Sequence, residues 1–435
     1  MIYWASLLHF YQPPVQIHAV LRRVVEESYR PLIELLRQFP YARLTVNING
    51  VLTEMLAEHG FDDVIAGLRE LAQRGQIEFT GSAKYHAILP LVPRSEALRQ
   101  VRRNYLTNRH FFGDTYRPQG FFPPEMCYSR DIVGPIVETG HRWLIVSGIA
   151  CPVEWPMDVV HQVPWADEGL AVFFRDDILS NKIAFQSVDG KGFIEHLRAL
   201  RKGRPGDIYV ITAMDAETFG HHIQGWEELF LADVYEQIGN GTLPSPAGPA
   251  QQQVVAQQHR GILTYEPESA EDEIRAVTIS ELLDRFPPGA PISPRASSWS
   301  TTAAELAAGE PFPLWKHSGN PVHRLQWEHT AITLELVHRA LEVADNEASQ
   351  GFARIARALL DPALHSCQYW WASRRPHWDI NMVHRGLLGQ QEATLNAFKA
   401  IESSGADAEV KRRSYHLVTA ARDAYAKITD QLFNT

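Results

Sequence analysis

The run Ile2-Tyr3-Trp4-Ala5-Ser6-Leu7-Leu8 decides the fold, because it is an almost unbroken apolar stretch of the length of a buried strand. Residues 17–38 follow it with apolar side chains at helical spacing. The first two elements predicted are therefore a strand and then a helix. A strand that is apolar throughout is typical of a parallel sheet covered by helices on both faces.

Later segments repeat this order of strand and helix. Further strands are predicted at residues 43–48, 77–80, 120–122, 143–146, 171–174, 207–211 and 276–278, and helices at residues 52–57, 64–74, 95–112, 132–140 and 192–201. Alternation of this kind indicates parallel strands. Six or seven such units predict a closed or nearly closed α/β barrel.

Two acidic stretches each place a carboxylate just after a strand-like apolar run. They are residues 121–128, with Glu125, and residues 211–222, with Asp215. Cleavage of a glycosidic bond needs one ionised carboxylate at the anomeric carbon and one protonated acid at the departing oxygen. His9 and Glu78 also lie near predicted strand ends, where barrels gather their reacting groups. The pattern predicts a carbohydrate-active enzyme.

Charge and cysteine content narrow the class of protein. The chain of 435 residues has 41 basic and 51 acidic residues and a net charge of −10, so we expect no nucleic acid or membrane partner. Its cysteines, Cys127, Cys151 and Cys367, lie far apart and form no CxxC pair. We see no signal peptide and no apolar run of about 20 residues. The sequence predicts a soluble cytoplasmic protein and leaves its oligomeric state open.

The pattern of predicted elements changes along the chain, from alternating strands and helices to long helices, and this change predicts two domains. Residues 1–292 hold the β/α units, and residues 293–435 hold long helical patterns at 326–346, 353–360, 385–403 and 409–432. Between residues 240 and 272 the periodicity is lost in a stretch rich in Pro, Gly and Gln. That stretch is predicted to be a long loop, either a lid over a site or a tolerated insertion.

Four motifs resemble those of glycoside hydrolase family 57. They are His9-Phe10-Tyr11-Gln12-Pro13, residues 77–90, Pro124-Glu125 and residues 214–221, in that order. The family comprises retaining enzymes that act mainly on α-glucans: amylases, 4-α-glucanotransferases, branching enzymes and amylopullulanases. The resemblance implies a (β/α)7-type distorted parallel barrel, then a mostly helical C-terminal domain that completes the substrate cleft. It also implies an α-glucan or malto-oligosaccharide substrate and no cofactor or metal.

The resemblance also assigns the two acids. Glu125 looks like the family's nucleophile, and Asp215 looks like its general acid and base. The alternatives without a catalytic role are a solvated loop acid for Glu125 and a helix N-cap for Asp215.

Other residues are expected to bind substrate. His9 fits a contact to a sugar hydroxyl, with a core histidine as the alternative. This chain departs from the family at Tyr11, where the usual motif has a second histidine, and at His222, where an aromatic residue is common. The remaining candidates are Gln12, Glu78, His86, Glu217, His221, Trp299, Trp315, Trp370 and Trp371. Core packing is the alternative for the tryptophans, and a loop brace is the alternative for His86.

Several activities fit these residues. An α-amylase-like hydrolase is the first hypothesis, and a 4-α-glucanotransferase or 1,4-α-glucan branching enzyme is the second, because hydrolysis and transfer use the same two acids. A homologue that binds glucan without cleaving it would be expected to lack one carboxylate. A metal-dependent carbohydrate hydrolase would need a His/Asp cluster around Zn²⁺, and no HxH or HxxxH pair stands beside the predicted strand ends.

Overall fold

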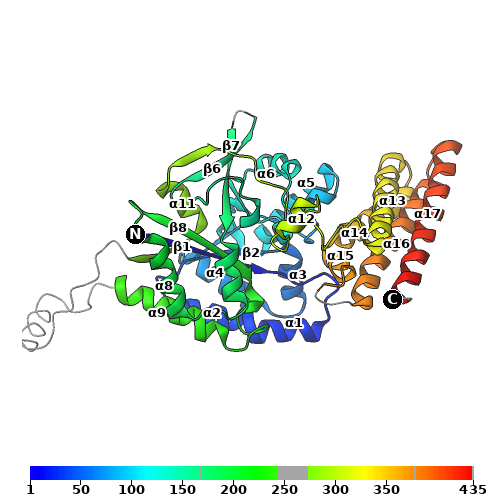
Figure 1. The fold of residues 1–435 in the computed structure, drawn as a ribbon. Coiled ribbons are helices and arrows are strands. Elements are labelled where there is room, and N and C mark those ends of the chain that lie inside the picture. Colours follow the sequence, from blue (N-terminus) through cyan, green and yellow to red (C-terminus); the bar gives the residue numbers. More distant parts are fainter. Residues whose placement is uncertain (167, 243–272, 376–378, 434–435) are drawn as a thin grey trace, which may run out of the picture.

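A computed structural model describes residues 1–166, 168–242, 273–375 and 379–433. In this part of the chain an α/β barrel is followed by long helices that stand against one side of it (Figure 1). The predicted loop at residues 240–272 falls mostly outside the described residues, so the lid stays a prediction.

Strand β1 (Ile2–Phe10) forms the centre of the first sheet, and all of its residues are buried. It pairs in parallel with β8 (Ile208–Asp215) along its length. On its other edge it pairs with β9 (Ile274–Val277) and then with β2 (Leu44–Ile48), and β3 (Ile77–Phe79) follows β2. Burial on both faces explains why the β1 sequence is apolar throughout.

The second sheet contains β4 (Gly120–Phe121), β5 (Trp143–Ser147) and β7 (Glu168–Arg175), which are parallel and adjacent in that order. A bridge between Gly81 and Phe121 joins it to the first sheet beyond β3. At the other side, the N–H of Asp176 donates to the carbonyl of Ile211 in β8. The two sheets together form a distorted α/β barrel.

One strand pair departs from the predicted pattern. β6 (Val160–Trp165) runs antiparallel to β7, and β10 (Pro288–Pro291) pairs with β6. β6 is only partly buried, so it has no continuous apolar run to reveal it in the sequence.

Helices surround the barrel strands, as the alternating pattern predicts. They are α1 (His18–Val24), α2 (Arg30–Gln38), α3 (Gly50–Glu58), α4 (Asp62–Gln73), α5 (Arg94–Phe112), α6 (Val133–Glu138), α7 (Asp177–Ala184), α8 (Gly190–Arg201), α9 (Asp233–Thr242) and α11 (Ile279–Arg285). The single helix predicted over residues 17–38 is divided by a π-helical turn, Val25–Tyr29. Inserted turns of this kind are frequent at functional sites. Here the Ser28 hydroxyl donates to the carbonyl of Ala216, just beyond β8.

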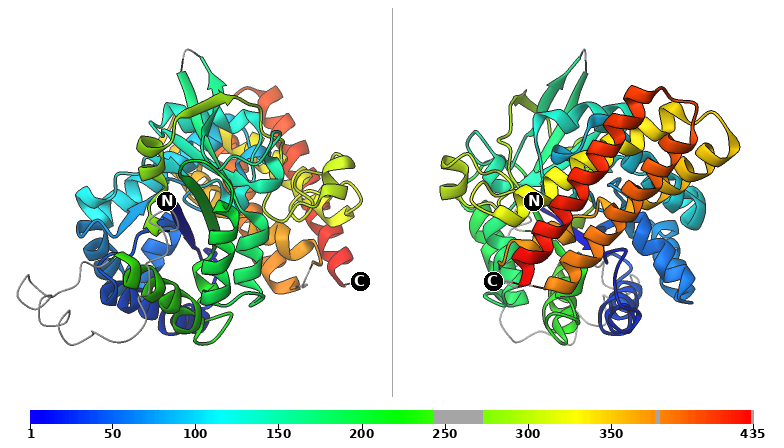
Figure 2. Two further views of the ribbon diagram at one scale, coloured as in Figure 1. Left: turned by 60° about the vertical axis from the view of Figure 1, so that its left-hand side comes forward. Right: turned by 90° about the vertical axis from the view of Figure 1, so that its right-hand side faces the viewer.

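The helical part comprises α12 (Ala303–Ala307), α13 (Pro321–Val343), α14 (Glu347–Ala363), α15 (Cys367–Ala372), α16 (Ile380–Ser403) and α17 (Ala408–Phe433). The four long helices α13, α14, α16 and α17 pack side by side (Figure 2). Their shared core is apolar and includes Leu336, Val337, Leu360, Ala397 and Ile401. The four helical patterns predicted after residue 326 correspond to these four helices.

A buried ionic cluster joins the barrel to the long helices. Arg357 of α14 donates to Glu96 of α5 at 2.7 Å and to Asp361 at 2.7 Å. Arg99 of α5 donates to Asp361 at 2.8 Å. The paired charges compensate one another, which fixes α5 against α14.

Among the described residues, no helix is both long and apolar enough to cross a membrane. The cytoplasmic location stays a prediction.

Candidate active site

A cavity of about 730 Å³ opens at the carboxyl ends of β1 and β8. The loops after these strands line it together with the turn after β4, with α7, and with segments of the helical part. Its lining includes His9, Gln12, Glu125, Arg175, Asp215, Glu217, Trp299, Trp370 and Trp371. The structure therefore gathers both predicted catalytic acids in one space.

Glu125 stands in a tight turn, Pro124–Met126, just beyond β4. Its φ of 57° lies in the left-handed region, which residues with side chains rarely adopt and which is common at functional sites. Nε1 of Trp299 donates to its Oε2 at 2.9 Å. Burial, and then the nearby charge of Asp215, raise the pKa of Glu125 to about 8, although the Trp299 hydrogen bond opposes this rise.

Asp215 is the last residue of β8 and lies beside His9 in the parallel register of β1 and β8. Burial raises the pKa of Asp215, while the charge of His9 in its protonated form and the charge of Arg175 oppose that rise. Burial also lowers the pKa of His9. The Nδ1 atom of the His9 ring lies 2.7 Å from Oδ1 of Asn47, which holds the ring in place at the cavity wall.

Glu217 follows two residues after Asp215 and is also buried. Its Oε1 accepts hydrogen bonds from Nε2 of Gln12 at 2.9 Å and from the hydroxyl of Tyr29 at 2.5 Å. Burial and the charge of Asp215 raise the pKa of Glu217 to about 8, against these two donors. The π-helical turn that carries Tyr29 thus positions a group of the site.

Three carboxyl groups share this buried cavity, so their mutual repulsion favours a state in which at least one holds a proton at neutral pH. Arg175 and His9 favour the ionised form of Asp215, whereas Trp299 favours the ionised form of Glu125. A protonated acid beside an ionised carboxylate is the arrangement that acid-assisted displacement needs.

His86 supports the wall behind Glu125 and does not line the cavity. Its ring stacks against those of Tyr11 and His9, with centroid distances of 3.9 and 4.9 Å. Its Nδ1 lies 2.8 Å from the hydroxyl of Ser366 and 3.7 Å from Oε1 of Glu125. Burial lowers the pKa of His86 well below its usual value, so the ring is neutral at pH 7. The residue connects the barrel wall to the segment just before α15.

The helical part supplies the opposite wall. Cys367, Trp370 and Trp371 of α15 line the cavity, as does Met382 of α16. The two indole rings stand nearly perpendicular, with centroids 4.7 Å apart. The cavity is therefore built by both parts of the chain.

Comparison with known proteins places this fold and site in a family. The sequence profile of glycosyl hydrolase family 57 matches residues 6–243, more than half of the chain. The chain belongs to glycosyl hydrolase family 57. This family 57 protein is 27% identical over 223 residues to a 4-alpha-glucanotransferase of Thermococcus litoralis, covering 49% of this chain and 32% of that protein. It is 26% identical over 221 residues to an alpha-amylase of Pyrococcus abyssi, with the same two shares. The chain spans about a third of the length of these curated relatives.

Solved structures share the architecture of this family 57 protein over nearly its whole length. A GH57-type branching enzyme from Pyrococcus horikoshii superposes with a TM-score of 0.67 at 16% identity, covering 97% of this chain and 96% of that one. The 4-alpha-glucanotransferase from Thermococcus litoralis superposes with a TM-score of 0.66 at 20% identity, covering 93% of this chain and 60% of that one. The predicted (β/α)7-type barrel followed by helices is confirmed.

Besides His86, three more predicted substrate-binding residues lie outside the cavity of this family 57 protein. Glu78 points within the barrel, where its Oε1 accepts from the Thr45 hydroxyl at 2.8 Å and from the Ser280 N–H at 3.0 Å. Trp315 is fully buried in the helical part. The Nδ1 atom of His221 lies 2.5 Å from Oε2 of Glu27, and the adjacent His222 lines the cavity instead.

Arg175, which the sequence reasoning missed, ends β7 at the cavity and is buried. Its guanidinium donates to the carbonyl of Ala213 at 2.7 Å, to Asp177 at 2.8 Å and to Asn181 at 2.9 Å. It also lies 5.9 Å from the ring centre of Trp299. Its position directly after the predicted strand 171–174 was the signal that could have identified it.

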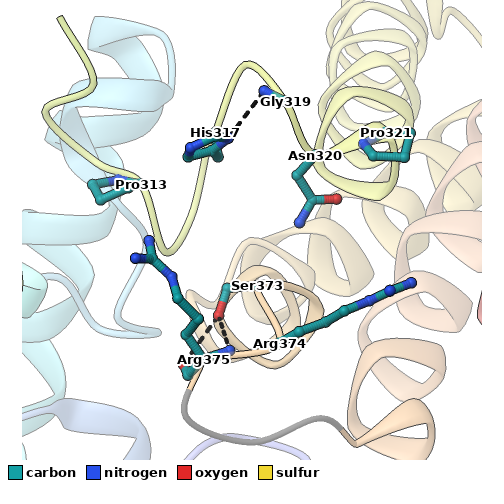
Figure 3. Close-up of a pocket in the computed structure, with 8 residues that line it drawn as sticks. All are labelled: Pro313, His317, Gly319, Asn320, Pro321, Ser373, Arg374 and Arg375. Carbon is teal, nitrogen blue, oxygen red and sulfur yellow. Dashed lines mark hydrogen bonds between the residues drawn. The ribbon is translucent and has the colours of Figure 1, made fainter. Parts of the chain in front are cut away.

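A smaller pocket of about 380 Å³ lies between residues 313–321 and 373–375 of the helical part (Figure 3). Its lining includes His317, Asn320, Ser373 and Arg375, and no Asp or Glu is among the described residues that form it. It therefore lacks the carboxyl pair that the larger cavity contains. Across the described ranges, no three His, Cys, Asp or Glu side chains gather in a way that could hold a metal ion.

Proposed function

We propose that this family 57 protein is a retaining enzyme that cleaves or transfers α-glucan chains through a covalent glycosyl-enzyme intermediate. One observation carries the proposal: Glu125 and Asp215, from separate strand ends, line the same cavity, where burial and the charge of Asp215 raise the pKa of Glu125. Two carboxyl groups at one sugar-sized cavity are the minimum for double displacement.

In the first step, the ionised Glu125 attacks the anomeric carbon while Asp215 donates its proton to the departing glycosidic oxygen. In the second step, Asp215 accepts a proton from water or from the hydroxyl of an acceptor sugar, which then displaces Glu125. Water gives hydrolysis, and a sugar gives transfer.

The charged groups that line the cavity affect the first step. With a pKa of about 8, Glu125 is ionised in only a minority of free molecules at pH 7. Positive charge that develops on the anomeric carbon favours the carboxylate and so lowers that pKa as the reaction proceeds. Asp215 must give and then take a proton, and the opposing effects of burial and Arg175 suit a group that changes its charge in each step.

Other residues of the cavity are proposed to hold the sugar. His9 is proposed to contact a hydroxyl of the sugar undergoing attack, while Gln12 keeps Glu217 in position. Trp370 and Trp371 offer indole faces on which the C–H face of a glucose unit can pack. We assign residues 1–292 to the catalytic barrel domain and residues 293–435 to the helical domain that completes the cleft.

The test is a product profile after incubation with maltoheptaose, with the Glu125→Gln variant purified in parallel as the control for contaminating enzymes. Shorter oligomers alone indicate an α-amylase-like hydrolase. A ladder of longer oligomers indicates a 4-α-glucanotransferase, and new branch points indicate a branching enzyme. A wild-type profile that equals that of Glu125→Gln contradicts the proposal.

A further inference from the structure

Phe185 is an aromatic residue at the cavity that none of the roles above uses. It follows α7 directly, lines the cavity and is 76% exposed. It belongs to none of the apolar clusters formed by the described residues. Its ring therefore contributes little to the packing of the core, although it covers part of the wall of the cavity.

The backbone around Phe185 is held firmly. The N–H of Gln186 donates to the carbonyl of Ile183, and the N–H of Ser187 donates to the carbonyl of Lys182 at 2.8 Å. These two bonds form a Schellman cap, in which the residue after the cap adopts a left-handed conformation and is usually glycine. Here Gln186 takes that position with a φ of 53°. The chain thus tolerates a strained residue in a fully hydrogen-bonded turn that fixes the position of Phe185.

A polar group lies one turn earlier on the same face of α7. Asn181 is four residues before Phe185 and also lines the cavity, so the two side chains are neighbours on the helix surface. The Oδ1 of Asn181 accepts from Arg175 at 2.9 Å, which orients the amide so that its NH₂ group is the part that can donate to a ligand. A flat apolar ring beside an amide donor suits one sugar unit, which has a C–H face and hydroxyl acceptors.

We propose that Phe185 and Asn181 form an outer subsite that binds one glucose unit of an α-glucan chain beyond the units at the two acids. This inference rests on the proposed function. Because α7 follows β7, and β7 adjoins β8, the subsite belongs to the wall that carries Asp215. Asp215 protonates the leaving oxygen, so the subsite is on the side of the leaving or acceptor chain.

The test compares Phe185→Ala with Phe185→Trp, which keeps an aromatic face. The control is Ile178→Ala, because Ile178 lies on the same helix, is 70% exposed and does not line the cavity. In Phe185→Ala, kcat/KM for maltoheptaose is expected to fall about tenfold, whereas kcat/KM for maltotriose changes less than about twofold. Phe185→Trp and Ile178→Ala are expected to keep the wild-type ratio of the two substrates.

Binding to an inactive enzyme provides a second readout. In the Glu125→Gln background, Phe185→Ala is expected to weaken maltoheptaose binding about tenfold by titration calorimetry, with an unchanged Tm. An unchanged affinity, or equal losses for both substrates, overturns the subsite while the wild-type product profile still upholds the proposed function. A wild-type enzyme that neither binds nor converts maltoheptaose overturns both.

Discussion

The indole N–H of Trp299 donates a hydrogen bond to Oε2 of Glu125 at 2.9 Å, and the two residues are 174 positions apart in the chain. Trp299 in turn lies against the guanidinium of Arg175. Arg175 donates to the carbonyl of Ala213, two residues before Asp215. One series of contacts therefore connects the two proposed catalytic acids. A substitution of Trp299 should alter the pKa of Glu125, and a substitution of Arg175 should alter the pKa of Asp215.

The Trp299→Phe variant should move the acidic limb of the pH profile. The indole N–H stabilises the carboxylate of Glu125, so its loss raises a pKa that is already about 8. Because the nucleophile must be ionised, the acidic limb of kcat/KM is expected to move to higher pH by about 1 to 2 pH units. Trp371→Phe, which changes another tryptophan of the cavity, should leave that limb in place. A limb that does not move in Trp299→Phe contradicts the role of the hydrogen bond.

The Arg175→Met variant should move the basic limb of the pH profile of kcat/KM. The positive charge of Arg175 opposes the rise in the pKa of Asp215, so its removal raises that pKa further. Asp215 then keeps its proton to higher pH, and the basic limb of kcat/KM is expected to move upward. The same variant should lower kcat, because Arg175 also anchors the end of β8. A shift of the basic limb to lower pH would mean that another group is the acid.

Removal of either acid should nearly abolish turnover. Glu125→Gln and Asp215→Asn are each expected to lower kcat on maltoheptaose by at least ~10³, because each group acts in every turnover. Azide added to Glu125→Ala should restore some product of the opposite anomeric configuration, which NMR can detect. Activity close to wild type in either variant refutes the corresponding assignment.

Glu78→Ala should affect stability more than catalysis. Glu78 bonds to Thr45 and to the N–H of Ser280 and does not line the cavity. Its removal leaves the Ser280 N–H without an acceptor and the Thr45 hydroxyl with only its bond from the Ile279 N–H, and is expected to lower the free energy of unfolding by about 1 to 3 kcal/mol, as measured in urea. A large loss of kcat at unchanged stability would instead support the substrate-binding role predicted from the sequence.

The ionic cluster between α5 and α14 offers a test of the interface. Arg357→Met removes the partner that Glu96 and Asp361 share, while His338 and Arg99 remain bonded to them, and is expected to cost about 1.5 to 3 kcal/mol of unfolding free energy. The control is Arg413→Met, which breaks an exposed pair with Glu335 and should cost less than about 1 kcal/mol. Equal losses in the two variants would show that the cluster does not stabilise the interface.

The sequence predicted the features that follow directly from buried strands. Glu125 and Asp215 each come after an apolar run, and strand ends of a barrel converge, so both acids could be placed together. Tyr29 could not be predicted, because its approach to Glu217 depends on a π-helical turn inside an ordinary helical pattern. For Trp299 and Trp315 alike the sequence left open a site residue or a core residue, yet Trp299 donates to Glu125 and Trp315 is fully buried, because tertiary packing decides between the two roles.

The most direct measurement of the central claim is the site of covalent attachment during turnover. A fluorinated malto-oligosaccharide donor that slows the second step should trap the glycosyl-enzyme, and mass spectrometry of its peptides should locate the sugar. The account predicts a sugar on the peptide that contains Glu125, and on that carboxylate. A sugar on Asp215 or Glu217, or the release of inverted product with no labelled enzyme, would contradict it.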